Sequence, residues 1–192
     1  MPRLSNAREQ IIERARSLLT ERGFDGFSYR DISEHLGIRN AAIHYHFPSK
    51  TDLGLALIQD VAQEMLDQIE EARKTLTPAQ QLNGYFEYEI QHCAHFDLCP
   101  VGALSTSWEV LSDDMRGAVA SFWQAVLDWL AEVLEKGRET GEIRFYGEPI
   151  DKARLIIAAV SGARQQARID GGNLVAQVAE QFRREMFAEA EN

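Results

Sequence analysis

The chain has 192 residues, of which 45% are hydrophobic, enough for one mid-sized core or for two unequal domains that share an interface. It contains no run of about 18 apolar residues, so no transmembrane helix is predicted. Its first residues are not an apolar signal segment, and two cysteines are too few for a disulfide framework. These features exclude a membrane-spanning or disulfide-stapled protein and predict a soluble, cytoplasmic protein with reduced thiols.

The charge is distributed unevenly along the chain. A net charge of −10 argues at first against a nucleic-acid partner. Residues 1–52, however, contain eight Lys and Arg against seven Asp and Glu, whereas the remainder contains 12 against 23. Three of the five histidines, His35, His44 and His46, also fall in the first part. A nearly neutral module on an acidic body can bind DNA if its cations lie on one face, so the charge pattern permits DNA binding without establishing it.

Helix signals begin at the N-terminus. Residues 6–9 have the pattern of a capping box, and Gly23 can end the first helix in a left-handed conformation. Residues 28–31 form a second box before a short helix, Gly37 provides a tight turn, and a third helix of about two turns runs to Pro48. The first of these helices carries apolar residues at helical spacing, namely Ile11, Ile12, Ala15, Leu18 and Leu19.

The signals continue to the C-terminus without a convincing strand. Residues 49–52 cap a fourth helix expected to reach about residue 76, and Pro78 begins a fifth. After a break at residues 97–100, the expected helices are a short one to about Leu111, a long one from Asp113 to about Gly141, and two more at roughly 150–170 and 173–189. The fold prediction is all-α with about nine helices.

Residues 28–47 have the pattern of a helix-turn-helix. The first helix is expected to bury Ile32 and Leu36, while Ile38 and Ile43 pack the second helix against it. Such a pair presents its second helix to the major groove of DNA. The outward-facing side chains would be Arg39, Asn40, Ala42, His44 and Tyr45. Because any helical hairpin can show this pattern, a hairpin with no DNA function is the alternative.

Two stretches of the chain carry a family pattern, residues 27–38 and the run Ile43-His44-Tyr45-His46-Phe47-Pro48-Ser49-Lys50-Thr51-Asp52-Leu53. Together they resemble the TetR family of transcription regulators. The family pattern joins an alanine-rich first helix, a Gly-Val/Ile turn, Leu-Tyr-x-His-Phe and Ser-Lys-x-x-Leu. The preceding residues 15–27 fit as well, so the match covers about 45 contiguous residues with intact spacing. The rest of the chain matches in architecture, including the connector at residues 141–143.

The resemblance implies a ligand-responsive regulator, most simply a repressor, with no enzymatic activity and no cofactor. Residues 1–50 would be a three-helix DNA-binding domain, and residues 51–192 a helical effector-binding and dimerisation domain. A homodimer would bind the half-sites of a palindromic operator, and effector binding would move the fourth helix and release the DNA. The predicted partners are therefore double-stranded DNA, a small molecule and a second copy of the chain, without a membrane.

The resemblance also assigns roles within the module. Arg39, Asn40 and Ala42 would contact bases, whereas the phosphate contacts would come from Arg30, His44, Tyr45 and Lys50. His44 stands where the family usually has tyrosine, and Ala41 stands where glycine is common. His46 could pin the end of its helix instead of touching DNA.

The effector site is expected among aromatic and polar residues of the central helices. Its predicted contacts are Tyr88, His92, Cys93, Phe96, Trp108 and Trp123, because largely apolar walls with a few polar groups are typical of small-molecule sites. An ordinary core is the alternative, since aromatic stripes at helical spacing more often belong to one.

The last two predicted helices are expected to form the dimer interface. The small residues Ala158, Ala159, Ser161, Gly162 and Ala163 would allow close helix approach, and Leu155 and Ile156 lie beside them. Val175, Val178, Phe182 and Met186 form a second apolar stripe. Packing against the chain's own core is the alternative.

Cys99 is predicted to be a sensing thiol. It precedes Pro100, so it is the expected N-cap of the following helix, where backbone N–H groups and the helix dipole favour the reactive thiolate. Residues 98–102 also resemble the Gly-Cys-apolar helix start of TetR-family regulators that respond to electrophiles and oxidants, with Leu98 in place of the glycine. Cys93 would be a less reactive, resolving partner.

Two alternatives concern the same residues: inert thiols, or a metal bound by His92, His95 and Cys99. The metal alternative lacks a standard zinc spacing, and no metal is predicted. Two other functional classes compete for the whole chain, an enzyme and a helical interaction module with a vestigial N-terminal motif. No glycine-rich phosphate loop, nucleophile elbow or paired carboxylates support an enzyme.

Overall fold

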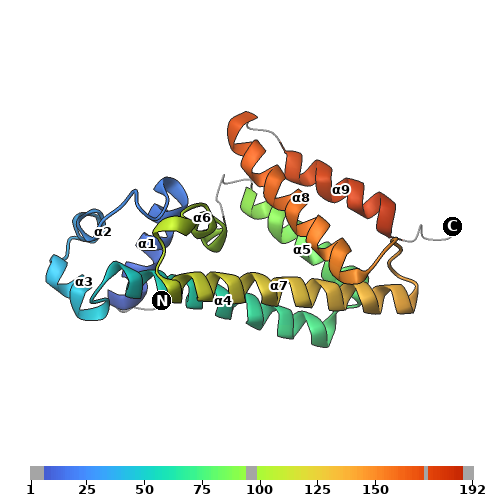
Figure 1. Ribbon diagram of the computed structural model, residues 1–192, viewed down its shortest axis with the longest axis horizontal. Helices are drawn as coiled ribbons and strands as arrows, with labels where there is room; N and C mark the ends of the chain where they lie inside the picture. Colours follow the sequence, from blue (N-terminus) through green and yellow to red (C-terminus); the bar gives the residue numbers. More distant parts are fainter. Residues whose placement is uncertain (1–6, 94–98, 171–172, 188–192) are drawn as a thin grey trace, which may run out of the picture. The chain divides into compact units, whose positions relative to one another are not determined.

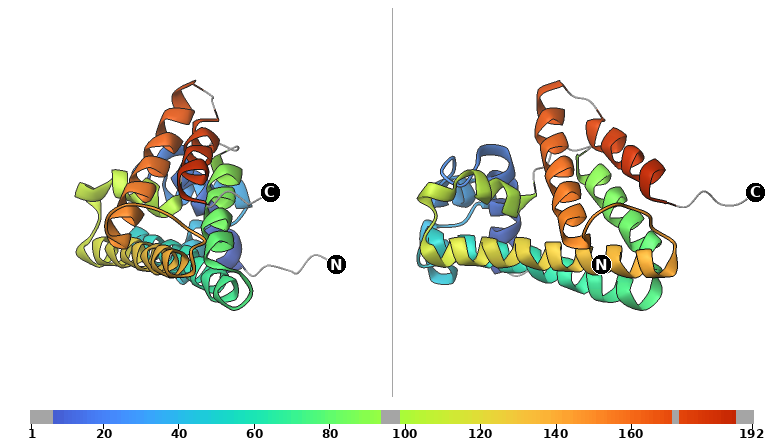
Figure 2. Two further views of the ribbon diagram at one scale, coloured as in Figure 1. Left: turned by 90° about the vertical axis from the view of Figure 1, so that its right-hand side faces the viewer. Right: turned by 45° about the vertical axis from the view of Figure 1, so that its right-hand side comes forward.

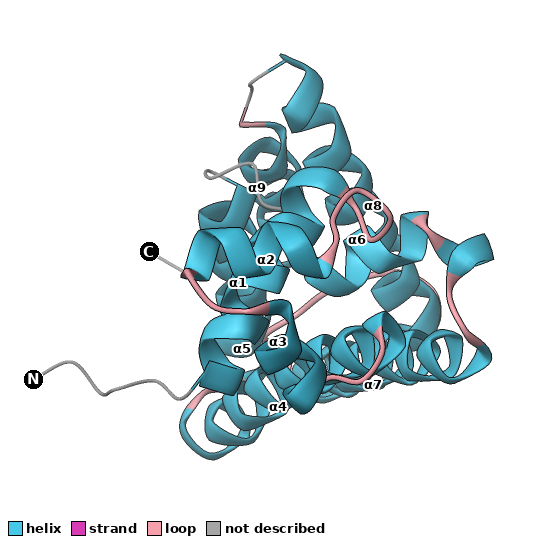
Figure 3. Ribbon diagram, turned by 90° about the vertical axis from the view of Figure 1, so that its left-hand side faces the viewer, coloured by secondary structure: helices cyan, strands magenta, loops and turns pink. Residues whose placement is uncertain are grey.

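The computed structural model describes residues 7–93, 99–170 and 173–187 (Figure 1). Helices account for nearly all of this part of the chain (Figure 3), which confirms the all-α prediction with nine α-helices. They are α1 (Ala7–Arg22), α2 (Tyr29–Leu36), α3 (Asn40–His46), α4 (Lys50–Thr75), α5 (Pro78–Cys93), α6 (Pro100–Thr106), α7 (Asp113–Thr140), α8 (Pro149–Asp170) and α9 (Leu174–Met186), with a 3₁₀ turn η1 (Trp108–Val110).

Two helices end earlier than expected. The helix that starts at Pro100 ends at Thr106, where the N–H of Ser107 donates to the Leu104 carbonyl at 2.9 Å and the chain passes into the 3₁₀ turn η1. The last helix ends at Met186, because Phe187 is extended and pairs with Ile143 in an isolated bridge. The predicted cap at Asn6 lies outside the described residues.

The described chain forms two compact units. The first comprises residues up to Met65 together with Cys99–Phe122, and the second comprises the remainder. The long helices α4 and α7 each contribute one part to each unit, so a unit is not one continuous stretch of sequence. None of the helices within the described ranges has the length and apolarity needed to span a bilayer.

The first unit has a core centred on α1, which packs against α2, α3 and α6. All five apolar residues predicted for its inner face are buried, together with Ile32, Ile43, Leu53, Leu57 and Leu104. Gly54 of α4 permits close packing, since a Cβ atom there would lie 2.4 Å from Cε of Met115 and 3.2 Å from the Phe24 ring. The helix-turn-helix, the beginning of α4 and the beginning of α7 therefore share one core.

The second unit contains α5, α8 and α9, which lie side by side (Figure 2). The rings of Phe86 and Phe182 stack with centroids 6.0 Å apart. Arg183 of α9 donates to Asn83 and Glu87 of α5 at 2.8 and 2.6 Å. The apolar side of α9 is thus used within the unit's own core.

Candidate nucleic-acid interface

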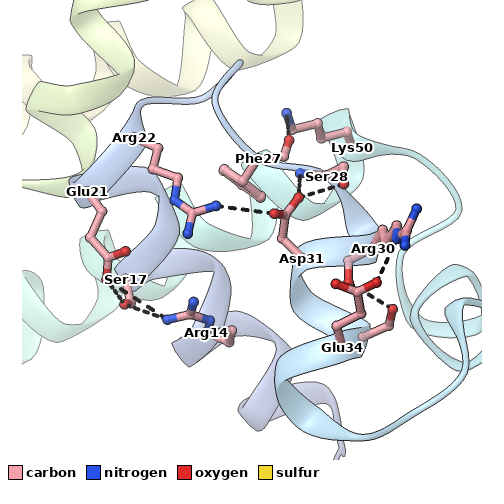
Figure 4. A network of polar contacts seen from close by, with 11 residues as sticks. Arg14, Ser17, Glu21, Arg22, Phe27, Ser28, Arg30, Asp31, Glu34 and Lys50 are labelled. Atoms are coloured by element: carbon pink, nitrogen blue, oxygen red, sulfur yellow. Dashed lines mark hydrogen bonds and ion pairs between the residues drawn. The ribbon is translucent and has the colours of Figure 1, made fainter.

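The turn before α2 is fixed by a capping box, as the sequence predicted (Figure 4). The backbone N–H and the hydroxyl of Ser28 donate to the Asp31 carboxylate at 2.8 and 2.7 Å, and Arg22 lies 3.2 Å from it. These hydrogen bonds from Ser28, assisted by the Arg22 charge, lower the pKa of Asp31. Gly37 ends α2 with a φ of +66°, a left-handed conformation that glycine adopts without strain.

Helix α3 presents one exposed face. Ile43 is fully buried, whereas Arg39, Asn40, Ala41, His44 and Tyr45 are exposed, Tyr45 by 84%. At 100° per residue, Ala41 and Tyr45 lie on the side of the helix opposite Ile43, and Asn40 and His44 lie one turn apart along one flank. Ala42 is half-buried, so Ala41 occupies the exposed position that the sequence analysis expected of Ala42.

Tyr29 holds the end of α3 against α2. Its hydroxyl lies 2.8 Å from the Phe47 carbonyl and 2.6 Å from the Ser49 carbonyl, so it can donate to either acceptor. Burial, with a smaller contribution from the Asp52 charge, raises the pKa of Tyr29 to about 12. Sequence reasoning did not single out this residue, although a tyrosine at the first position of a short helix beside an expected turn is a signal for such an anchor.

His44 is the exposed neighbour of this anchor. Its Nδ1 lies 3.2 Å from the Pro48 carbonyl oxygen, and its ring meets the Tyr29 ring edge-on with centroids 4.8 Å apart. The side chain is therefore fixed on the exposed face of α3.

Lys50 is engaged within the module (Figure 4). Its Nζ donates to the carbonyls of Phe24 and Phe27 at 2.5 and 2.6 Å and lies 4.8 and 4.5 Å from the centroids of their rings. Burial lowers the pKa of this ammonium group. The arrangement ties the loop between α1 and α2 to the start of α4, a role that the sequence pattern did not indicate.

Other described cations of the module are more exposed than Lys50 or join it to α4. Arg30 pairs with Glu34 at 2.6 Å, and both side chains are well exposed. The Arg8 guanidinium lies 5.5 Å from the Phe47 ring centroid and so adds a cation beside the end of α3 that the sequence analysis did not list. Arg16 joins α1 to α4 through Asp60 at 2.7 Å and Glu64 at 3.0 Å.

The predicted effector contacts are only partly gathered. Tyr88 is 42% exposed and Trp123 half-buried, and both belong to the second unit. Trp108 belongs to the first unit, is 40% exposed, and has the Arg116 guanidinium 5.9 Å from its ring centroid. The side chains of His92 and Cys93, at the end of α5, and the whole of Phe96 lie outside the described part of the structure.

The second unit contains a buried ion pair that the sequence analysis did not predict. Arg164 of α8 lies 2.7 Å from Glu89 of α5, and their side chains are only 7% and 13% exposed. Buried ion pairs are costly to desolvate unless they are well paired. The pair places two charged groups between α5 and α8.

The predicted dimer residues fall into two groups. On α8, the predicted residues Leu155, Ala158 and Gly162 are exposed, Leu155 by 53%. Ile169 on the same helix, which the prediction did not include, is 88% exposed. By contrast, the inward-facing members of the prediction are Ile156, Ala163, Val175, Phe182 and Met186, all of which are buried in this chain. Leu155, Ala158, Gly162 and Ile169 thus form an exposed stripe on α8, whereas the apolar side of α9 is largely buried within this chain.

Cys99 is the N-cap of α6 and precedes a proline at the first helical position, as predicted. Its side chain is half-buried. The alternative metal site with His92 and His95 involves side chains outside the described residues. Within the described ranges, no three His, Cys, Asp or Glu side chains are grouped closely enough to hold a metal ion.

Comparison with known proteins supports the assignment of the N-terminal module. The family model "Bacterial regulatory proteins, tetR family" matches residues 11–57. A TetR-family transcriptional regulator from Agrobacterium tumefaciens is 32% identical and superimposes with a TM-score of 0.89, over 94% of this chain and 97% of that chain. The Escherichia coli (strain K12) repressor NemR is 26% identical over 171 residues, which is 85% of each protein.

A solved structure of E. coli NemR in its reduced form has the same fold, with a TM-score of 0.82 at 23% identity over 96% of this chain and 98% of that chain. The near-complete coverage and 32% identity of the Agrobacterium protein place the whole chain, beyond the N-terminal match, in one family. The chain therefore belongs to the TetR family of helix-turn-helix, DNA-binding transcriptional regulators, which are not enzymes.

Proposed function

We propose that this regulator is a repressor that binds an inverted-repeat operator as a homodimer and leaves it when a small effector binds. The observation that carries the proposal is the exposed face of α3, held in place by the Tyr29 hydroxyl and by the buried Ile43. A fixed, exposed second helix is what major-groove recognition requires. Residues 1–50 would bind DNA, and residues 51–192 would bind the effector and the second subunit.

The residues of this face divide by chemistry. Arg39 and Asn40 would contact base edges, since arginine pairs with guanine and asparagine with adenine. Ala41 offers the methyl surface expected earlier of Ala42. Arg30, His44 and Tyr45 would contact phosphates, and Lys50 would position the module through its two carbonyl contacts.

We assign the homodimer interface to the α8 stripe of Leu155, Ala158, Gly162 and Ile169. Two observations support it: the stripe is apolar and exposed, and a Cβ placed on Gly162 would meet nothing within 4 Å in this chain. A second copy related by a two-fold axis would place small residues against small residues and allow close approach. Phe182, which stacks on Phe86, would serve the fold instead.

The effector site is proposed for the second unit, at Tyr88 and Trp123 with the Glu89–Arg164 pair supplying charge. His92, Cys93 and Phe96 remain predicted contacts, and Trp108 is a weaker candidate because it belongs to the other unit. An apolar wall with few polar groups favours a small, largely apolar effector.

A second, covalent signal is proposed for Cys99. The thiol is the N-cap of α6, and α6 packs against α1 in the first unit. Conjugate addition of the thiolate to an electrophilic quinone would replace a ring C=C π bond by a carbon–sulfur bond. The electron pair would move to a carbonyl oxygen, which takes a proton from solvent, and the adduct would place bulk at this helix start. Titrating the protein–DNA complex with such a quinone should release DNA from wild type and not from Cys99→Ser, while Cys93→Ser should respond like wild type or more slowly.

The test of the main proposal is selection of DNA from a random pool by the purified protein. An enriched inverted repeat is expected, with two half-sites bound by one dimer. Asn40→Ala should relax the preference at one base pair and weaken operator binding by about 1–3 kcal/mol. Asn173→Ala, at the exposed residue before α9, should leave that preference unchanged. Absence of any enriched sequence would refute the proposal.

A further inference from the structure

The hydrogen bond of His44 fixes where its proton lies. A carbonyl oxygen can only accept, so the contact with Pro48 requires that Nδ1 carry the hydrogen. The edge-on Tyr29 ring restrains the imidazole from a second direction, and the Tyr29 hydroxyl is itself fixed by two carbonyls. With Nδ1 bound inside the module, Nε2 is the ring nitrogen left for a partner outside it.

The charge of the ring decides what Nε2 can do. In the neutral ring with hydrogen on Nδ1, Nε2 carries a lone pair and can only accept. Phosphate oxygens are also acceptors, so a neutral His44 has no hydrogen to offer them. The imidazolium carries hydrogen on both nitrogens and could donate from Nε2 while keeping its bond to Pro48.

We propose that His44 contacts a DNA phosphate only as the imidazolium, so that operator binding takes up a proton at each half-site and tightens as the pH falls. The inference rests on the proposed function, because it assigns a protonation state to one contact of that interface. His44 lies one turn from Asn40 on the exposed face of α3, which places it beside the residues proposed to contact bases.

Several of the charged groups on and around α3 already have partners within the module. The titratable or charged side chains on α3, on its cap and on the two helices packed against it are Arg8, Glu9, Glu13, Arg14, Arg16, Glu21 and Arg22 of α1, Tyr29, Arg30, Asp31, Glu34 and His35 of α2, and Arg39, Tyr45 and His46; Lys50 and Asp52 begin the following helix, α4. Asp31 and Asp52 accept hydrogen bonds from Ser28 and Ser49, and Glu34 pairs with Arg30. With its pKa raised to about 12, Tyr29 stays neutral near pH 7.

Within the described part of the structure, the contacts of the His44 ring are thus the Pro48 carbonyl and the Tyr29 ring. Among the described residues, no carboxylate pairs with His44 to hold the imidazolium in the free protein. The phosphate would supply the missing negative partner, and histidine is the side chain whose charge changes between about pH 5 and 8. Phosphate binding favours the charged form, so its contribution to affinity is present at low pH and lost as the pH rises.

The test measures operator affinity by fluorescence anisotropy at constant ionic strength, with a selected operator fragment, from about pH 8 to about pH 6. Wild-type affinity should rise by roughly tenfold or more over this range, because a hydrogen bond to a charged group is among the stronger ones. His44→Gln should bind weakly with little pH dependence. His44→Tyr should also be nearly independent of pH and should exceed wild type near the upper end, because a phenol donates without taking up a proton. His46→Gln is the matched control and should keep the wild-type pH dependence.

Calorimetry in two buffers of different ionisation enthalpy gives a second readout, since proton uptake on binding should be seen for wild type and lost in His44→Gln. A pH-independent wild type, or a His44→Gln variant with the wild-type pH dependence, would overturn the inference and leave the proposed function standing. Absence of specific DNA binding at every pH would overturn the proposed function itself.

Discussion

Lys50→Met tests whether the start of α4 is anchored as the structure shows. Methionine retains most of the aliphatic stem and its contact with the rings of Phe24 and Phe27, but removes the ammonium group that donates to their carbonyls. Hydrogen bonds from a charged donor contribute about 1.5–3 kcal/mol each. Desolvation of the ammonium, which lowers its pKa, opposes part of this gain. We therefore expect the free energy of unfolding to fall by about 2 kcal/mol.

The competing role for Lys50, a phosphate contact, predicts different observations. Loss of a phosphate contact would reduce the slope of log affinity against log salt by about 0.9 for each half-site, with little effect on stability. An anchoring lysine should leave that slope unchanged. Urea unfolding and operator titrations between about 50 and 200 mM salt measure both quantities.

Arg30→Met is the matched control, because Arg30 is exposed and its surface pair with Glu34 contributes little to stability. It should reduce the salt slope and hardly change the unfolding midpoint. If Lys50→Met instead behaved like Arg30→Met, with a reduced slope and unchanged stability, the anchoring argument would be refuted.

Three further predictions concern assembly and stability. Leu155→Glu should give folded monomers in sedimentation, because it places a charge in the exposed α8 stripe; an unchanged dimer would move the interface elsewhere. Asp31→Asn should make the thermal unfolding midpoint less sensitive to acid. The lowered pKa of Asp31 gives stabilisation that is present above pH 3.8 and lost as the pH falls through the folded-state pKa. An unfolding midpoint that falls with acid as steeply as in wild type would contradict this. Gly137→Ala should destabilise the protein by about 1–3 kcal/mol in urea, because the added Cβ would lie 2.4 Å from Cδ1 of Ile143, and a wild-type midpoint would disprove the close fit.

Local signals in the sequence predicted the helices well. The serine caps before α2 and α4 and the proline starts of α5 and α6 act within a few residues, so the sequence alone contains them. The end of α6 was missed because the chain changes there from an α-helix to a 3₁₀ turn, and neither a glycine nor a proline marks the change in the sequence.

The roles of single side chains were harder to predict, because they depend on residues distant in sequence. Lys50 meets carbonyls of residues 24 and 27, and Arg164 meets Glu89 across 75 positions. An exposed cation and a buried one look alike in sequence. Likewise, the apolar patterns of α8 and α9 both suggested a dimer surface, and only packing shows that α9 uses its stripe within the second unit.

The contacts of α1 suggest how a signal could reach the DNA-binding helix. Its buried face packs against α2, α3 and α6, while Arg16 on its outer side is joined to Asp60 and Glu64 of α4. Lys50 adds a second tie between α4 and the loop that follows α1. We infer that α3 cannot shift alone, because it packs against α1. A displacement of the first part of α4, or of α6 through Cys99, would have to carry α1 with it. If either helix moved separately, these ion pairs would break or the close-packed core would open. In a dimer, such a joint displacement would change the spacing of the two α3 helices, and a fixed half-site spacing is what binding to a palindrome requires.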